Sequence, residues 1–176
     1  MSDFLDLAKA RQSCRKFADK PVEHEKLVKC VEAGRLTPSG CNSQPWSFIV
    51  VETPDLVAKV AKTGQQNGMN PYLSGAKAFI IVVEEPAVLV PAIRSMLDGQ
   101  YFAKGDLGAA TEHICLEAES VGLGSIIIGI YDRPTLRELL GIPAEKQFGA
   151  LIGIGYSNDK LREKQRKPLA DIVKYM

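Results

Sequence analysis

The sequence predicts an α+β or α/β sandwich built on one central β-sheet, and three observations lead to this prediction. Short apolar runs typical of strands alternate along the chain with segments whose apolar residues recur at helical spacing. The run 78–83 is apolar at every position, as expected of a strand covered on both faces. With 176 residues, of which 45% are hydrophobic, the chain 1–176 has the length of a single domain and can bury about 70% of its unfolded surface.

Two helices and a strand are expected first. Residues 3–10 should form a short helix with Ser2 as its N-cap. Residues 23–35 should form a longer amphipathic helix. Its apolar stripe consists of Leu27, Val28 and Val31. The loop around Pro38 ends this helix and leads into a buried strand over 46–52.

A third helix and a polar loop are expected next. Thr53 should cap this helix, and Pro54 fits its first turn. Its core face comprises Leu56, Val57, Val60 and Ala61. Residues 63–75 are polar and glycine-rich, so we expect a loop that serves as a lid or as one wall of a pocket.

The second half continues the alternation. Residues 106–121 should form a long buried helix, and Gly122 is well placed to end it. A strand over 125–131, a helix over 132–140 and a strand over 148–155 are expected after it. The last residues are charged and then weakly apolar, and a tail of this kind is expected to dock on a partner chain.

Composition excludes several classes of function. A net charge of +1 gives no electrostatic reason to expect binding to nucleic acid or to an anionic membrane surface. No apolar run is long enough to span a bilayer, and the acidic N-terminus lacks the layout of a signal peptide. We therefore expect a cytoplasmic protein.

The four cysteines carry no metal-site pattern. They are scattered, without a C-x-x-C pair or a histidine at zinc-ligand spacing, so no metal is expected. Cys14 and Cys41 lie in polar segments, but a thiol nucleophile needs a base beside it and none is visible. We interpret all four as reduced thiols without a catalytic role.

Two basic segments could bind a phosphate. Arg11 and Arg15 flank the hydroxyl of Ser13, and the two guanidinium groups converge whether the segment is extended or helical. Planar guanidinium forks match the oxygens of a phosphate dianion. Lys164 and Arg166 form a second basic cluster near the C-terminus. The alternative interpretation is a set of solvated surface cations.

The loop 37–46 could bind a flat polar ring. It combines turn-forming residues with the amides of Asn42 and Gln44, and it runs directly into a strand. Amides donate and accept hydrogen bonds, as the edge of a heterocycle requires. The alternative is a turn that merely leads into a strand.

The glycines of segment 122–129 do not form a dinucleotide-binding fingerprint. Such a cradle follows a strand and opens a helix, whereas these glycines follow a predicted helix and open a predicted strand. The third glycine also stands one residue too late.

Three motifs resemble those of the FMN-dependent nitroreductase family, of the compact kind. They are R-x-S-x-R-x-F at 11–17, P-S-x-x-N-x-Q-P-W-x-F at 38–48 and K-x-R-x-P at 164–168. The resemblance covers nearly the whole chain, with the elements in the family's order. It implies an α+β nitroreductase-like three-layer sandwich with a mixed central sheet. It also implies a homodimer with a long interface helix at 106–121 and an exchanged C-terminal arm at about 160–176.

The resemblance also implies which residues would hold FMN. The phosphate and ribityl chain would contact Arg11, Gln12, Ser13 and Arg15, and the tail residues Lys164 and Arg166 would close over the phosphate. The loop residues Pro38, Ser39, Asn42 and Gln44 would reach a flavin bound largely by the other subunit. The backbone of Ile128 and Gly129 would lie beside the flavin N5 and O4, where an N–H stabilises negative charge on the reduced ring. Family members often have Trp where Ile127 stands, which puts substrate stacking there in doubt.

The implied activity is that of an FMN-dependent NAD(P)H oxidoreductase. NADH or NADPH would reduce the flavin, and a nitroaromatic, a quinone or a similar electron-poor small molecule would then take the electrons in a ping-pong mechanism. No side chain is required as acid or base, so no catalytic residue is assigned.

Three alternatives remain open at this point. The first is another flavin reaction on the same scaffold, such as dehalogenation, dehydrogenation of peptide-derived rings or flavin breakdown. The second is a flavin-binding module without turnover, with its pocket blocked by 63–75 or by 86–104. The third is a non-flavin α/β protein in which the motifs are coincidental. The sequence does not choose between NADH and NADPH or identify the acceptor.

Overall fold

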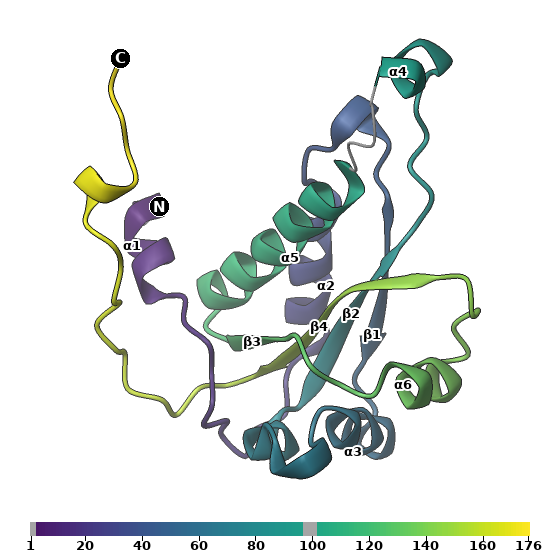
Figure 1. Cartoon of the computed structure of the whole chain (residues 1–176). Coiled ribbons are helices and arrows are strands. Elements are labelled where there is room, and N and C mark those ends of the chain that lie inside the picture. Colours follow the sequence, from purple (N-terminus) through teal and green to yellow (C-terminus); the bar gives the residue numbers. More distant parts are fainter. Residues whose placement is uncertain (1–2, 97–101) are drawn as a thin grey trace.

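The computed structural model describes residues 3–96 and 102–176 and has three layers (Figure 1). The middle layer is a sheet formed by β1 (Trp46–Val51), β2 (Ala78–Glu84), β3 (Gly124–Ile128) and β4 (Gln147–Gly155). The helices are α1 (Phe4–Ala10), α2 (His24–Arg35), α3 (Pro54–Thr63), α4 (Pro91–Met96), α5 (Phe102–Ser120) and α6 (Arg133–Leu140). Helices α2 and α5 cover one face of the sheet, and α3 and α6 cover the other. The predicted α+β sandwich is confirmed.

The sheet has the order β1-β2-β4-β3, and each neighbouring pair is antiparallel. Within the described residues, parallel pairing is limited to an isolated bridge between Ser13 and Ser125. The sheet is therefore mixed only through the N-terminal segment, which runs beside the edge strand β3.

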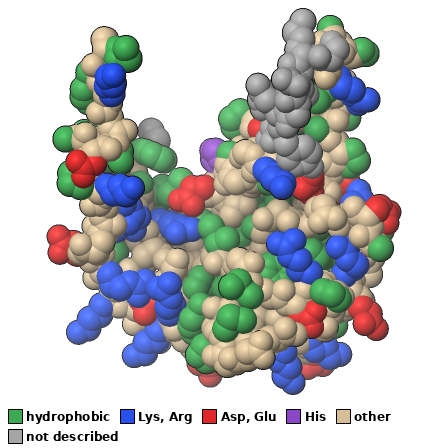
Figure 2. Space-filling view, in the orientation of Figure 1, with side chains coloured by type: hydrophobic (Ala, Val, Ile, Leu, Met, Phe, Trp, Pro, Cys, Tyr) green, Lys and Arg blue, Asp and Glu red, His purple; other side chains and the backbone are tan. Residues whose placement is uncertain are grey.

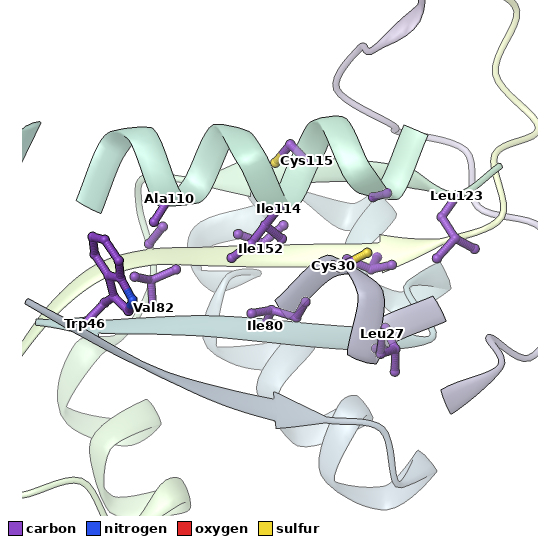
Figure 3. Packing of buried hydrophobic residues seen from close by; sticks show 14 of the residues in the cluster. Leu27, Cys30, Trp46, Ile80, Val82, Ala110, Ile114, Cys115, Leu123 and Ile152 are labelled. Atoms are coloured by element: carbon purple, nitrogen blue, oxygen red, sulfur yellow. The ribbon is translucent and has the colours of Figure 1, made fainter. Parts of the chain in front are cut away.

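The central strand β2 separates two hydrophobic clusters. Ile80 and Val82 point toward α2 and α5, where they meet Ala110, Ile114 and Ile152 (Figure 3). The alternate β2 residues Phe79, Ile81 and Val83 pack toward α3 and α6. Successive side chains of a strand point to opposite faces, so a strand covered on both sides must be apolar throughout.

Two details of the predicted helices are wrong, and a third is confirmed only in part. The N-cap of α1 is Asp3, whose carboxylate accepts a hydrogen bond from the Leu5 N–H at 3.3 Å; the predicted cap Ser2 lies outside the described residues. In α2, Val28 is 50% exposed, and the buried positions are Leu27, Cys30 and Gly34. Thr53 occupies the N-cap position of α3 as predicted, but its side chain makes no capping hydrogen bond within the described residues.

Two elements of the second half also differ from expectation. Strand β3 ends at Ile128 because the chain leaves the sheet there, and Asp132 then caps α6 by accepting a hydrogen bond from the Thr135 N–H at 3.1 Å. Helix α4 lies in the stretch 86–104, for which the sequence predicts no element. Residues 97–101 of that stretch lie outside the described part.

The segment 63–75 is organised rather than open. It contains the short 3-10 helices η2 (Gln66–Gly68) and η3 (Pro71–Gly75), and the side chain of Leu73 is fully buried. The Asn70 side chain, on a residue with a left-handed backbone, donates a hydrogen bond to the Gly64 carbonyl at 2.8 Å. Leu73 therefore anchors this segment to the core.

The C-terminal segment after β4 runs beside the N-terminal segment and then extends away from the body, with the short 3-10 helix η4 (Leu169–Asp171) near its end (Figure 1). Leu169, Ile172 and Tyr175 are exposed along it. Among the described helices, none is both long and apolar enough to cross a bilayer.

Candidate functional site

The segment 11–15 is extended and not helical. Its Cys14 N–H donates to the Ser125 carbonyl at 2.9 Å, so the segment lies along the edge of β3. Alternation along an extended chain places Arg11, Ser13 and Arg15 on one side and Gln12 and Cys14 on the other. Cys14 is buried, which agrees with this arrangement.

Arg11 is held loosely for a mostly buried arginine. Its side chain is 16% exposed and forms one ion pair, with the Glu112 carboxylate on α5 at 3.4 Å. Its Nε is buried and has no hydrogen-bond partner among the described residues. Buried polar groups are nearly always paired, so an unpaired one calls for an explanation, and a ligand is a common one.

The C-terminal arm, which we define as residues 157–176, converges on this segment. The Lys164 ammonium donates to the Arg11 carbonyl, and the Arg162 guanidinium donates to the Ser13 carbonyl at 2.7 Å. The carboxylate of Asp159 accepts a hydrogen bond from the Arg15 N–H at 2.6 Å. The two basic clusters of the sequence are thus brought together by the fold. Lys and Arg side chains gather beside the arm, on the left of the molecule (Figure 2).

The electrostatics of this cluster favour an anion. The pKa of Lys164 is lowered, first by burial and then by the positive charges of Arg166 and Arg11. Like charges held close together repel one another, and a dianion placed among them would relieve this repulsion. Burial raises the pKa of the Glu119 carboxyl on α5, against the lowering effect of the nearby Lys164 and Arg11.

The loop 38–44 has a strained backbone. It contains the 3-10 helix η1 (Gly40–Asn42), and Cys41, Asn42 and Gln44 have positive φ values of 54°, 52° and 47°. Such conformations cost free energy in non-glycine residues and often occur at ligand sites. The Ser39 hydroxyl accepts a hydrogen bond from the Gln44 N–H at 2.9 Å. In the described part of the chain, the buried hydroxyl of Ser43 has no hydrogen-bond partner.

This loop does not join the basic cluster within one chain. The Gly40 N–H donates to the Asp106 carboxylate near the start of α5 at 3.1 Å. Further along the same helix, Arg11 pairs with Glu112, and Lys164 interacts electrostatically with Glu119 near the end of the helix. Asp106 and Glu119 are about three and a half turns apart. A single subunit therefore presents the two predicted halves of the site separately.

The predicted residues at the end of β3 lie beside the 63–75 segment. Ile128 is buried and Gly129 is exposed. A hydrogen bond of 2.8 Å from the Asp132 N–H to the Thr63 carbonyl, and one of 2.6 Å from the Gln66 amide to the Asp132 carboxylate, tie the two segments together. Ile127, where an aromatic residue is frequent, is 40% exposed.

Tyr72 is a site residue that the sequence reasoning missed. Its ring centroid lies 6.0 Å from the Arg15 guanidinium carbon, and its hydroxyl donates to the Asn70 side-chain oxygen at 2.5 Å. Tyr72, which belongs to the segment 63–75, therefore positions the Arg15 side chain. The Asn-Pro pair at 70–71, a turn signal in a glycine-rich stretch, was the available clue.

Thiol labelling should distinguish one cysteine from the other three. Cys41 is exposed, whereas Cys14, Cys30 and Cys115 are buried. Burial raises the pKa of all three, that of Cys30 to about 12, so their reactive thiolate forms are scarce at neutral pH. We expect iodoacetamide to label Cys41 alone in the folded protein and all four thiols after unfolding, as read by peptide mass mapping. Cys41→Ser should abolish native labelling, and rapid modification of a second thiol would contradict the structure.

Comparison with known proteins gives a consistent result. The Nitroreductase family profile matches residues 8–156. A protein of Archaeoglobus fulgidus, whose name gives NADH dehydrogenase or NAD(P)H nitroreductase as its assumed activity, is 33% identical over 164 residues, which cover 91% of this chain and 88% of that protein. An iodotyrosine deiodinase of Thermotoga neapolitana is 22% identical over 197 residues, with 99% and 98% of the two chains covered.

A solved structure has the same fold. An FMN-dependent nitroreductase of Clostridium difficile superposes with a TM-score of 0.78 at 25% identity, over 98% of each chain. The matched sequence runs from α1 to the end of β4, and the superposition also includes the arm. The chain belongs to the nitroreductase family.

Proposed function

We propose that this chain is an FMN-dependent oxidoreductase that passes electrons from NAD(P)H to nitroaromatics, quinones or similar electron-poor acceptors. The observation that carries the proposal is the convergence of Arg11 with Lys164, far apart in sequence, into one incompletely satisfied cationic cluster. A phosphate dianion fits such a cluster, because charge-assisted hydrogen bonds to guanidinium and ammonium groups are the strong ones.

The residues present also fit the rest of FMN. The hydroxyl of Ser13 lies between two arginines in the extended segment and suits the phosphate or the ribityl chain. The backbone of Ile128 and Gly129 would lie along the flavin ring. Pro38, Ser39, Asn42 and Gln44 would approach the ring from the other subunit, since one chain holds them away from the basic cluster.

The protein's contribution is binding and orientation. When bound, FMN would supply the redox chemistry between NAD(P)H and the acceptor, as a ping-pong mechanism requires. Arg11, Lys164 and Arg166 would hold its phosphate. The exposed side chain of Ile127 offers the acceptor an apolar contact without aromatic stacking.

A homodimer completes the proposed site. Several apolar side chains of α1 and of the arm are exposed in the described part of one chain; they include Phe4, Leu5, Leu161, Leu169 and Ile172. Contiguous exposed apolar surface marks association sites. We propose that α5 lies at the dimer interface, that the arm at about 160–176 wraps the partner, and that the single-domain protein acts in the cytoplasm.

A spectroscopic titration tests this function. We expect the purified protein to carry, or to take up, about one FMN per subunit, and its visible bands to bleach when NADH or NADPH is added without oxygen. Bands that persist would indicate another flavin reaction, such as dehalogenation or dehydrogenation, or a binding role without turnover. Absence of flavin binding, even with excess FMN, would refute the proposal.

A further inference from the structure

Gln12 faces away from the phosphate side of its segment. Its neighbours Arg11 and Ser13 point to the opposite side of the extended chain. The two ends of its amide are both engaged by the arm: the Gln12 Nε2 donates to the Lys160 carbonyl at 3.1 Å, and its Oε1 accepts from the Arg162 N–H at 3.1 Å. Both partners in the arm are main-chain groups, so the contact depends on where the backbone of the arm lies and not on its side chains.

The amide is the central part of a continuous seam between two distant segments. On one side of it, the Asp159 carboxylate accepts from the Arg15 N–H; on the other, the Lys164 ammonium donates to the Arg11 carbonyl. The residues joined at Gln12 and Arg162 are 150 positions apart in the sequence. Bonds over such a separation hold only when the arm is seated, because nothing local maintains them.

We propose that Gln12 is a positioning residue that docks the arm, and that cofactor retention depends on this docking. The inference rests on the proposed function, since Lys164 and Arg166 can reach a bound phosphate only from a seated arm. It assigns Gln12 a role different from direct contact with FMN, because both ends of its amide already have partners in the arm.

Docking and cofactor binding must then be linked in both directions. If a seated arm strengthens FMN binding, bound FMN must stabilise the seated arm by the same factor. Lys160, Arg162 and Lys164 are trypsin sites within the seam, so limited proteolysis reports whether the arm is seated. FMN should protect these sites in the unsubstituted protein.

The test uses Gln12→Leu in the full-length protein, which removes both hydrogen bonds and keeps a side chain of similar length. Loss of two neutral hydrogen bonds corresponds to a change of about tenfold. We expect trypsin to cut the arm about tenfold faster in the FMN-free variant, and FMN to dissociate about tenfold faster. Gln147→Leu is the matched control: it places the same residue at an exposed position at the start of β4, away from the arm, and should change neither rate.

The outcomes distinguish a failure of the Gln12 inference from a failure of the proposed function. Unchanged arm cleavage with weaker FMN binding would overturn the inference and return Gln12 to direct cofactor contact. Faster cleavage with unchanged FMN dissociation would overturn the proposal that FMN retention depends on a docked arm. No change in either rate would also overturn the proposal that Gln12 docks the arm. Failure of the unsubstituted protein to bind FMN would refute the proposed function, whereas cleavage measured without FMN would still test whether Gln12 docks the arm.

Discussion

Arg11→Ala should weaken FMN binding by about ten- to a hundredfold. A hydrogen bond to a charged group contributes about 1.5–3 kcal/mol, which corresponds to this range of affinities. Within the described residues, the Arg11 guanidinium forms one ion pair, with Glu112 at 3.4 Å, and its Nε has no hydrogen-bond partner. The loss should therefore appear in cofactor affinity more than in the free energy of unfolding. Quenching of flavin fluorescence on titration measures the dissociation constant.

Two further variants make the Arg11 result specific. Lys59→Ala removes a cation from the exposed surface of α3, away from the basic cluster, and should leave FMN affinity unchanged. Arg166→Ala should weaken binding in the same direction as Arg11→Ala. The phosphate assignment is wrong if neither Arg11→Ala nor Arg166→Ala changes the dissociation constant.

Gly124→Ala should destabilise the protein by about 1–3 kcal/mol, the usual cost of overpacking a close contact. A Cβ added at Gly124 would lie 2.9 Å from the Cβ atoms of both Cys14 and Ser157, closer than side-chain carbons approach one another. Neither atom can swing away, since each is fixed to its backbone. Cys14 belongs to the phosphate-binding segment and Ser157 begins the arm, so FMN affinity should fall as well.

Chemical denaturation followed by circular dichroism measures the stability change. Lys59→Ala, at an exposed position of α3 and away from α5, is the control. A surface substitution of this kind should change the free energy of unfolding by less than about 0.5 kcal/mol. Gly124→Ala with unchanged stability would mean that the three segments meet less closely than in this structure.

Much of the fold could be predicted because its signals are local. The unbroken apolar run at 78–83 becomes β2, and Gly122 ends the turn after α5 with a φ of 78°. Helix α4 could not be predicted, since a short helix among prolines and apolar residues has no distinctive period. The stripe of α2 was misassigned at Val28, because which face of a helix is buried depends on what packs against it.

The candidate site, like the fold, could be predicted only in part. Residue type marked Arg11 and Lys164 as candidate phosphate ligands, because guanidinium and ammonium groups form strong charge-assisted hydrogen bonds to phosphate. Pattern alone could not show that Tyr72 lies against Arg15, because they come from separate segments joined only by packing.

By itself, the sequence determined the order of the helices and strands other than α4, the doubly covered strand β2 and the chemistry of the candidate phosphate-binding groups. These follow from side-chain periodicity and functional-group chemistry, which neighbouring residues already contain. Only the tertiary structure decided that Gln12 bonds the arm and that the loop 38–44 lies apart from Arg11 in one subunit. The reason is physical: hydrogen bonds between segments about 150 residues apart depend on how the whole chain packs, and no local pattern encodes that distance.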